Sequence, residues 1–484
     1  MKKYIAKIAL LFVFISISLF LVSNYSKAFT NYIQIIYPKN NQIIFASSTF
    51  IVGNTSPDSS LVINNKSVKV FPSGSFVHVV NLIPGKNTIS IRSNNYNQER
   101  ISILSLTRKN PPDSSQRQIV IQPIPTVLIE TKGYTAVRKN PGNPIRLFTV
   151  KKDNKFYADA LAGGFYRVKL GNTYAYVAKK DVEADEDNRD FITQVIQNVQ
   201  FEEDERNTYI KIEAEEEFPV ELKASGNTLT AVLYYSKINV TDAFMQENKT
   251  DGISKIYKLT DNTLSIKLSS PQLNGYDYFY DDDYLIIKIA KPFSAGLKGK
   301  VVAVDPGHGG KDQGSVGPTA IAEKDINLGI ASYLKDELEK AGATVIMTRS
   351  NDIYMGLYDR VDKAFEENAD ILVSIHNNAH PDGVDPYEIH GTSTYYYNDN
   401  AKFLAENIQD KLVRATGFKN LGIKTASFAL TRPSYPVSVI VEVGFMINPY
   451  EYEKLIQKSF QKQAAEGIKT GIEAYFNNIS EKSL

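Results

Sequence analysis

The spacing of apolar and polar residues divides the chain into two kinds of pattern. Between residues 32 and 292, short runs alternate apolar and polar positions with a period of two, and turn-forming pairs such as Asn64-Asn65 and Pro84-Gly85 separate them. This period is typical of half-buried β-strands. The β-type runs of this region include residues 49–52, 60–63, 75–80, 88–91, 209–212, 229–233, 263–268 and 284–289. This part of the chain is therefore predicted to form small β-rich domains.

After Lys300 the pattern changes to apolar strands that alternate with amphipathic helices. Ile326, Ile330, Leu334 and Leu338 recur every four residues and predict a helix over residues 325–341. Further helices are expected near residues 358–368, 401–416 and 459–476, and strands at 300–304, 344–348, 370–375, 394–397 and 437–441. Such alternation predicts an α/β domain with a mostly parallel sheet flanked by helices.

The chain of 484 residues is too long for a single core, so a multidomain fold is expected. N-terminal all-β modules should precede the α/β domain. The predicted segments are a signal peptide at 1–28, a β-sandwich at 31–108, a linker rich in Pro, Ser and Gln at 109–125, a small β-barrel at 126–185, a second β-sandwich at 190–293 and the α/β domain at 297–484.

The N-terminus has the composition of an export signal. Lys2, Lys3 and Lys7 precede an apolar run over residues 8–22, and the small residues Ser26 and Ala28 follow it. The alternative is an uncleaved anchor, but the run is shorter than the roughly 20 residues that a membrane-spanning helix needs. We therefore expect an exported protein in the periplasm or in the cell wall and extracellular space, with no membrane association after the signal is removed.

Charge and cysteine content exclude several classes of protein. The chain has 55 basic and 54 acidic residues, and no basic stripe points to nucleic acid. Acidic clusters at 183–187, 202–205, 213–217 and 281–283 are interpreted as solvated faces, the alternative being a cation or partner site. Because cysteine is absent, neither a disulfide framework nor a thiol nucleophile is possible.

Three widely separated segments bring chemically active residues to the ends of predicted strands. His308 lies in the sequence DPGHGG, His376 in SIHNN and Glu442 in VEVGF. Ligands of α/β proteins bind where the strands of the sheet end. A catalytic zinc takes three protein ligands and keeps one position for water. A lone histidine is more often structural, but His308, Glu323 and His376 together supply that count.

Glu442 is the candidate for proton transfer. It ends an apolar run, where an ionised carboxylate is costly without a partner. The structural alternative is an ion pair with Arg432 or Arg349. In the catalytic interpretation, zinc lowers the pKa of water toward about 7, and Glu442 takes a proton from that water and passes it to the leaving amine.

Other polar residues near these motifs receive different interpretations. His380 follows His376 by four residues, as in helical zinc proteases, but Pro381 and Gly383 interrupt any helix, so His380 is expected on a loop beyond the site. His390 is a candidate for lining the substrate groove. The closeness of Ser374 and His376 in the sequence is not interpreted as a serine triad.

These motifs carry a resemblance. Residues 297–484 resemble the zinc-dependent N-acetylmuramoyl-L-alanine amidases of bacterial cell-wall turnover (amidase_3 type), which have DPGHGG, a glutamate about fifteen residues later, SIH-x-N, and a glutamate before GF. The resemblance implies one Zn²⁺ on His308, Glu323 and His376, and Glu442 as the catalytic residue. It also implies a substrate, the amide bond between N-acetylmuramic acid and L-alanine in peptidoglycan.

Two further expectations concern residues close to the second histidine motif. Asn377 departs from the family, which usually has a small residue there, and it is expected at the rim of the metal site. Asn378 and Arg432 are candidate substrate-binding residues. Only residues 377–390 separate His376 from Gly391, which leaves little room for the helical insertion that covers the zinc in some amidases. An open groove is expected, and a need for an activator or divisome protein is left open.

The β-rich segments also resemble known modules. Residues 53–91 look like immunoglobulin-like modules of exported enzymes, residues 126–182 like a bacterial SH3-like module, and residues 191–292 like an AMIN-type sandwich. These resemblances imply placement on peptidoglycan. The leading hypothesis is thus an exported zinc amidase for cell-wall remodelling, autolysis or daughter-cell separation. The alternatives are a non-catalytic wall-binding protein and a zinc peptidase or deacetylase acting on another envelope substrate.

Overall fold

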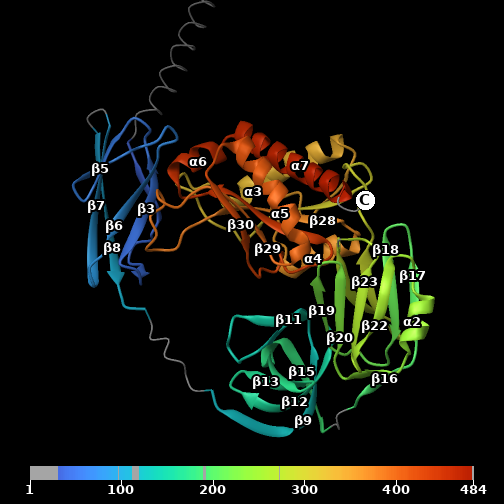
Figure 1. Cartoon of the computed structure of the whole chain (residues 1–484). Helices are drawn as coiled ribbons and strands as arrows, with labels where there is room; N and C mark the ends of the chain where they lie inside the picture. The colour runs from blue at the N-terminus through green and yellow to red at the C-terminus, as the bar shows by residue number, and fades with distance from the viewer. Residues whose placement is uncertain (1–30, 96–97, 112–118, 189–191, 272, 482–484) are drawn as a thin grey trace, which may run out of the picture.

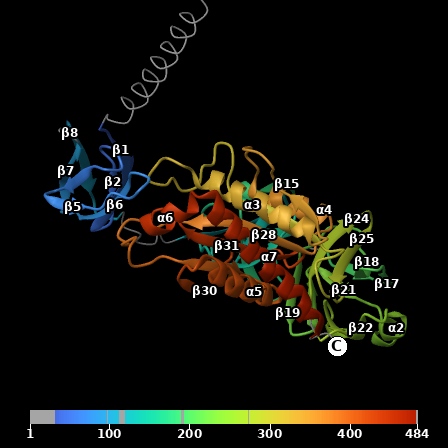
Figure 2. The same ribbon diagram turned by 90° about the horizontal axis from the view of Figure 1, so that it is seen from above.

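The structure is a computed structural model that describes residues 31–95, 98–111, 119–188, 192–271 and 273–481. The predicted signal peptide lies outside these residues, as does part of the predicted linker. Within the described ranges, no helix combines the length and the apolar character that a membrane span requires. The α/β domain lies between β-rich units (Figures 1 and 2). The protein is therefore multidomain, with a large β-rich N-terminal region and an α/β domain.

The first β-rich unit consists of two sheets that enclose an apolar core. The sheets have the strand orders β1-β3-β6 and β2-β8-β7-β4-β5. Ile51 and Phe76 from the first sheet meet Leu61, Ile91 and Leu106 from the second. The strands are β1 (Ile33–Tyr37), β2 (Ile43–Ile44), β3 (Ser48–Thr55), β4 (Ser60–Ile63), β5 (Lys66–Val68), β6 (Ser75–Asn81), β7 (Gly85–Asn95) and β8 (Gln98–Arg108). We call this unit the N-terminal domain.

The next unit contains a seven-stranded antiparallel sheet of order β11-β10-β14-β13-β12-β9-β15. Its strands are β9 (Ile121–Thr131), β10 (Thr135–Arg138), β11 (Arg146–Val150), β12 (Lys155–Ala162), β13 (Phe165–Leu170), β14 (Thr173–Ala178) and β15 (Val182–Asn188), with a 3₁₀ turn η1 (Lys179–Asp181). The predicted barrel segment therefore forms regular β-structure, as the period-two pattern indicates.

Two four-stranded antiparallel sheets follow, of orders β17-β18-β25-β24 and β19-β20-β23-β22, beside a short parallel pair β16-β21. Their apolar residues and those of the seven-stranded sheet form one continuous buried cluster, from Ile129 to Ile289. The elements are β16 (Gln194–Ile196), β17 (Val199–Glu203), β18 (Asn207–Glu213), β19 (Val220–Ser225), β20 (Thr228–Leu233), β21 (Ser236–Ile238), α2 (Asp242–Asn248), β22 (Ile253–Thr260), β23 (Thr263–Leu268), β24 (Tyr276–Asp281) and β25 (Tyr284–Ala290). Because they share this core, we call residues 121–290 the middle unit.

The α/β domain is built on a six-stranded sheet of order β27-β26-β28-β31-β29-β30. The first four strands in this order are parallel to one another, and β29 runs antiparallel to β31. The elements are β26 (Val301–Pro306), α3 (Glu323–Lys340), β27 (Thr344–Met347), α4 (Leu357–Glu366), β28 (Ile371–Asn378), β29 (Thr392–Tyr396), α5 (Asp399–Thr416), β30 (Asn420–Thr425), β31 (Val437–Phe445), α6 (Pro449–Leu455) and α7 (Lys458–Glu481). A mostly parallel sheet flanked by helices confirms the predicted class of this domain.

Helices cover both faces of this sheet. Residues of α3, α5 and α7 pack on one face against β26, β28 and β31, and α4 packs on the other face through Val361 and Ala364. Helix α3 begins at Glu323, two residues before its predicted start. The prediction missed these residues because the first turn is polar and shows no hydrophobic periodicity. Burial on both faces explains the nearly continuous apolar sequence of the central strands.

The middle unit is joined to the α/β domain by polar and aromatic contacts. Arg206 forms an ion pair with Asp370, directly before β28, and Lys288 Nζ donates to Asn368 Oδ1 at 3.0 Å. Tyr134 stacks on Tyr358 at the start of α4, with ring centroids 4.2 Å apart. The two bodies are therefore held at both ends of the α4–β28 segment.

Glycines permit the close packing of α7 on α5. A Cβ on Gly471 would lie 2.5 Å from Ile408 Cα and 2.9 Å from Asn407 O, which are backbone atoms of α5. We expect Gly471→Ala to lower the free energy of unfolding by about 1–3 kcal/mol because the helices must separate. Alanine is otherwise preferred in helices by roughly 1 kcal/mol, so the clash must outweigh that preference. Urea unfolding followed by circular dichroism measures the change.

The control is Gly329→Ala in α3, where the nearest atom is Gln461 Oε1, the movable end of a side chain. This variant should lose much less stability than Gly471→Ala. Equal stability of the two variants would contradict the close helix contact.

Candidate metal centre

The three chemically active segments meet at one edge of the sheet. In the parallel register, Pro306 pairs with Ile375 between β26 and β28, and His376 pairs with Glu442 between β28 and β31. His308 lies two residues beyond the end of β26. The predicted convergence of the motifs at the carboxyl ends of parallel strands is thus observed.

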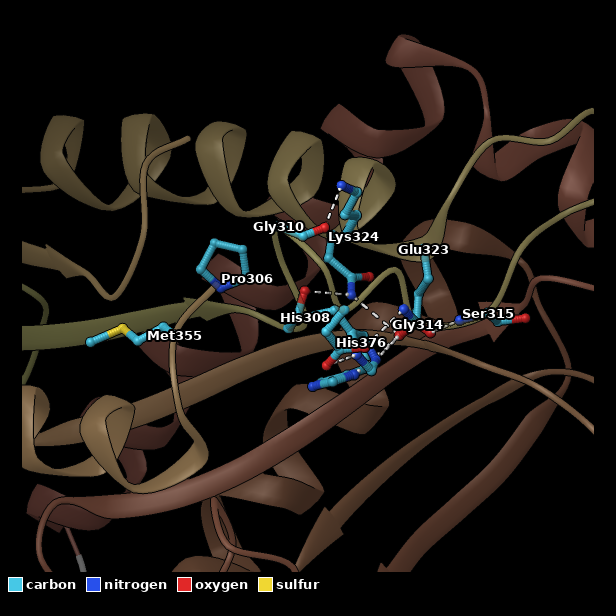
Figure 3. A network of polar contacts seen from close by, with 12 residues as sticks. Pro306, His308, Gly310, Gly314, Ser315, Glu323, Lys324, Met355 and His376 are labelled. Atoms are coloured by element: carbon cyan, nitrogen blue, oxygen red, sulfur yellow. Dashed lines mark hydrogen bonds and ion pairs between the residues drawn. The ribbon is translucent and has the colours of Figure 1, made fainter. Parts of the chain in front are cut away.

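His308, Glu323 and His376 form a compact set of possible metal ligands (Figure 3). Glu323 Oε1 lies 3.2 Å from His308 Nε2 and 3.1 Å from His376 Nδ1. One donor atom from each residue lies within 4.8 Å of the others. Glu323 is the first residue of α3, so the helix start places its carboxylate between the two imidazoles. Two histidines and one carboxylate are a ligand set that catalytic zinc uses.

The turn that carries His308 has an unusual backbone conformation. His308 itself has a φ of 61°, and Gly309 and Gly310 also have positive φ. A non-glycine residue in this region is strained and persists only where its surroundings hold it. Two buried arginines do so, since Arg360 donates to His308 O at 2.8 Å and Arg349 donates to Gly307 O at 2.9 Å.

Asp305 balances the charge of one of these arginines. Its carboxylate is fully buried and accepts from Arg360 Nη1 at 2.6 Å and from Ser374 Oγ at 2.6 Å. Burial alone would raise the pKa of Asp305, but Arg360, Ser374 and Thr348 outweigh it and hold that pKa below its ordinary value. Arg349 and Arg360 were not predicted as site residues. Their partners are backbone carbonyls far away in the chain, and such bonds produce no recognisable sequence motif.

Two glycines leave room for the imidazoles. A Cβ on Gly307 would lie 2.2 Å from the ring of His376, and one on Gly314 would lie 2.6 Å from the ring of His308. Neither contact is possible for a real side chain. The glycines of this region therefore allow the histidines to approach the backbone and each other.

The electrostatics of the set suit a cation. Glu323 is only 4% exposed, and although burial opposes its charge, His308 and His376 hold its pKa well below its ordinary value. Burial would lower the pKa of His308, but Glu323 and Asp312 raise it to about 9. Asp312 Oδ2 lies 2.9 Å from His308 Nδ1, and its negative charge favours hydrogen on that nitrogen. His308 Nε2 therefore faces Glu323. In protonated His308 this nitrogen carries the second proton, and a metal ion could occupy the same position.

Glu442 differs from the other carboxylates at this edge. Its Oε2 is buried and has no hydrogen-bond partner among the described residues. Burial raises the pKa of Glu442 to about 7, with His376 acting in the opposite direction. The alternative of an ion pair with Arg349 or Arg432 is not observed, since these arginines bond to backbone carbonyls and to Tyr358 instead.

Comparison with known proteins identifies the α/β domain. The profile of the N-acetylmuramoyl-L-alanine amidases, Amidase_3, matches residues 302–474. YqiI of Bacillus subtilis, an uncharacterised protein, is 38% identical over 185 residues, which are 37% of this chain and 87% of YqiI. The chain belongs to the N-acetylmuramoyl-L-alanine amidase family. We therefore call residues 297–481 the amidase domain.

Two other relatives have assigned activities. The N-acetylmuramoyl-L-alanine amidase LytC of B. subtilis is 37% identical over 234 residues, which are 48% of this chain and 44% of LytC. The catalytic domain of CwlV, an amidase from Bacillus (Paenibacillus) polymyxa var. colistinus, is 35% identical, and the match covers 36% of this chain and 97% of that domain with a TM-score of 0.35. The chain thus spans less than half the length of LytC.

Asn377 lies beneath the site, and its predicted place at the rim is wrong. The residue is 1% exposed, its backbone N donates to Glu323 Oε1 at 3.1 Å, and its Nδ2 donates to Asn327 Oδ1 at 2.8 Å. Asn327 in turn donates to Glu323 Oε1 at 3.2 Å. The strand alternation could have shown this, because the neighbour of His376 must point to the other face. Asn377 and Asn327 support the carboxylate of Glu323 from behind.

The remaining candidates of the amidase domain lie outside the donor set. His380 stacks on Phe445 with ring centroids 4.3 Å apart and lies on the loop after β28, as predicted. His390 pairs with the buried Glu451 at 3.0 Å. Asn378 Oδ1 accepts from the backbone of Ala379, so its role in substrate binding stays a prediction.

Arg432 lies away from the donor set, and its predicted substrate contact also stays untested. Its Nη2 donates to Tyr358 OH at 2.9 Å, and it lines a cavity of about 500 Å³ between the amidase domain and the middle unit. Residues 377–390, which were expected to be too short for a covering helical insertion, contain no helix; the first two end β28 and the others form a loop.

The buried pair beneath the His308 turn leads to a stability prediction. We expect Asp305→Asn to lower the free energy of unfolding by about 3–5 kcal/mol, because Arg360 would remain buried without its counter-charge. The low pKa of Asp305 means that the ionised form stabilises the fold above the unfolded carboxyl pKa, near 4, and that this contribution is lost as the pH falls below it. The difference between wild type and variant should therefore shrink toward pH 3 in calorimetric unfolding.

Asp410→Asn is the matched control, since Asp410 forms an exposed ion pair with Arg414. Its loss should cost less than about 1 kcal/mol. A comparable loss in both variants would refute the special role of the Asp305–Arg360 pair.

Proposed function

We propose that this protein is an exported, zinc-dependent hydrolase that cleaves the amide bond between the lactyl group of N-acetylmuramic acid and L-alanine in peptidoglycan. The observation that carries the proposal is the compact set His308, Glu323 and His376, with Glu442 directly across from His376 in the sheet register. The family of the domain supports the choice of bond. The named activity of LytC agrees with it.

His308, Glu323 and His376 would hold one Zn²⁺ ion. The donor types, their mutual distances and the buried negative charge of Glu323 fit this ion. When bound, zinc activates water as a nucleophile and polarises the carbonyl of the substrate. Asp312 directs the correct nitrogen of His308 to the site, and Asn327 orients the carboxylate of Glu323.

Glu442 would move the proton. A carboxyl group with a pKa of about 7 is partly ionised at neutral pH, so it can accept a proton from water and later donate it to the leaving amine nitrogen. Its unpartnered Oε2 is the atom proposed to do so. Ser374 takes no part, because its Oγ donates to Asp305 inside the domain. The chain also lacks cysteine.

The β-rich units are proposed to place the enzyme on its polymeric substrate. In this proposal residues 31–108 are an immunoglobulin-like sandwich, residues 126–185 an SH3-like barrel and residues 190–293 an AMIN-like sandwich, behind a signal peptide at 1–28. The observed two-sheet and single-sheet units agree with β modules of this size.

The metal proposal predicts a difference between two histidines. His376→Ala should lose stoichiometric zinc, because one of three ligands is removed, whereas His380→Ala should retain one zinc per chain. Elemental analysis of the purified full chain after dialysis measures the content. Retention of zinc by His376→Ala, or its loss from His380→Ala, would overturn the assigned ligands.

The activity proposal is tested by digestion of purified peptidoglycan and mass spectrometry of the products. The wild-type chain should release intact stem peptides with a free L-alanine amine, and a chelator should abolish the release until zinc is restored. Glu442→Gln should bind zinc normally but lose on the order of 10²–10⁴-fold in rate, because the amide cannot accept the proton.

Each alternative has a different outcome in the same experiment. A zinc peptidase or deacetylase would expose another amine or carboxylate. A non-catalytic wall-binding protein would sediment with peptidoglycan and release nothing in the presence of zinc.

A further inference from the structure

The segments that leave the metal centre all reach the same face of the N-terminal domain. Residues 311–322 connect His308 to α3, residues 379–391 follow β28, and residues 446–455 follow β31 and include α6. Each contacts the sheet β1-β3-β6. The N-terminal domain stands beside α6 in both views of the molecule (Figures 1 and 2).

An apolar cluster forms the middle of this contact. Phe50, Val52 and Val77 of the sheet are buried together with Ile447 of the amidase domain. Their strand neighbours Ile51 and Phe76 point the other way, into the core of the N-terminal domain. The sheet is therefore covered on both faces, and the side chains of Phe50, Val52 and Val77 are buried against the amidase domain.

Hydrogen bonds attach the loop after β28. Asp382 accepts from Tyr37 OH at 2.7 Å and from Thr49 Oγ1 at 2.5 Å. Tyr387 OH donates to Val77 O at 2.8 Å. The same loop contains His380, which stacks on Phe445 at the end of the strand that carries Glu442. The loop that is bonded to the N-terminal domain is thus also in contact with Phe445, which lies on the same strand as Glu442.

The other two segments are attached in the same way. Asn54 Nδ2 donates to Pro318 O at 2.6 Å, within the connection from His308 to Glu323. Ser75 Oγ donates to Glu453 Oε1 at 2.8 Å, at α6. The partners from the N-terminal domain lie on β3 and β6, which are adjacent strands.

We propose that the N-terminal domain is a positioning domain for the metal centre, and that it forms one active unit with the amidase domain. Loops without regular structure hold a defined path only where other groups fix them. The sheet β1-β3-β6 supplies these groups for residues 311–322 and 379–391, the two loops that border the donor set. Asn54 and Val77 of the sheet, and Asp382 of the loop that the sheet holds, are the positioning residues. This inference rests on the proposed amidase function.

The test uses the full chain with Val77→Asp, which places an unpaired charge in the apolar contact without touching the core of the N-terminal domain. Amide hydrogen exchange of residues 311–322 and 379–391 should become at least about tenfold faster as the domain detaches. On a soluble muramoyl-peptide, kcat should fall on the order of tenfold to a hundredfold at saturating zinc, while KM changes little. Elemental analysis should still give one zinc per chain.

The matched control is Val62→Asp, since Val62 lies between the core residues Leu61 and Ile63 and points to the outer face of the second sheet. It should leave both exchange and kcat unchanged. A second pair of variants acts from the loop side. Asp382→Ala should reproduce the loss of kcat. Asp382→Asn, whose Oδ1 still accepts from Thr49 Oγ1 and whose Nδ2 can donate to Tyr37 OH, should restore most of it.

The outcomes separate this inference from the proposed function. Faster exchange in Val77→Asp with unchanged kcat would overturn the positioning role, and unchanged exchange would overturn the contact itself. If the wild-type chain releases no peptide, the proposed function fails, while the exchange data still decide whether the N-terminal domain holds the loops.

Discussion

Burial of the carbonyl groups in the turn after β26 is the constraint on which the rest of the site depends. The turn reverses sharply and points its oxygens into the domain, where no strand or helix can pair them. Arg349 and Arg360 supply the missing donors, and Asp305 balances the charge of Arg360. This arrangement keeps His308 in its left-handed conformation, and His308 can therefore face Glu323 and His376. The ligand geometry is in this sense a consequence of the hydrogen bonds that Arg349 and Arg360 make beneath the turn.

The domains predicted from the sequence do not coincide with the separate hydrophobic cores of the structure. The middle unit spans two predicted domains but has one continuous apolar cluster. The N-terminal domain has its own core and a second apolar contact with the amidase domain. Two β-rich bodies therefore attach to different parts of the amidase domain, one at the α4–β28 segment and one at the loops around the metal centre. Sequence modules and cooperative units need not coincide.

Local periodicity could predict the α/β class. It could also predict that the three motifs meet, because the carboxyl ends of parallel strands lie at the same edge of a sheet. The loop position of His380 could be predicted from Pro381 and Gly383. The arginines beneath the turn could not, since their partners are backbone oxygens far away in the chain. Docking of the N-terminal domain left only a faint signal in the uninterrupted apolar run from Phe50 to Val52, where a half-exposed strand would alternate.

The docking face of the N-terminal domain is synthesised before the residues that cover it. Phe50, Val52 and Val77 are synthesised early, whereas their neighbour Ile447 comes near the end of the chain. During synthesis the first domain can complete its own core and still present an uncovered apolar face. Such a face invites association with other chains until its cover arrives. Closure of this face therefore waits for the segment that contains Ile447, and the interval before that segment emerges carries a risk of aggregation.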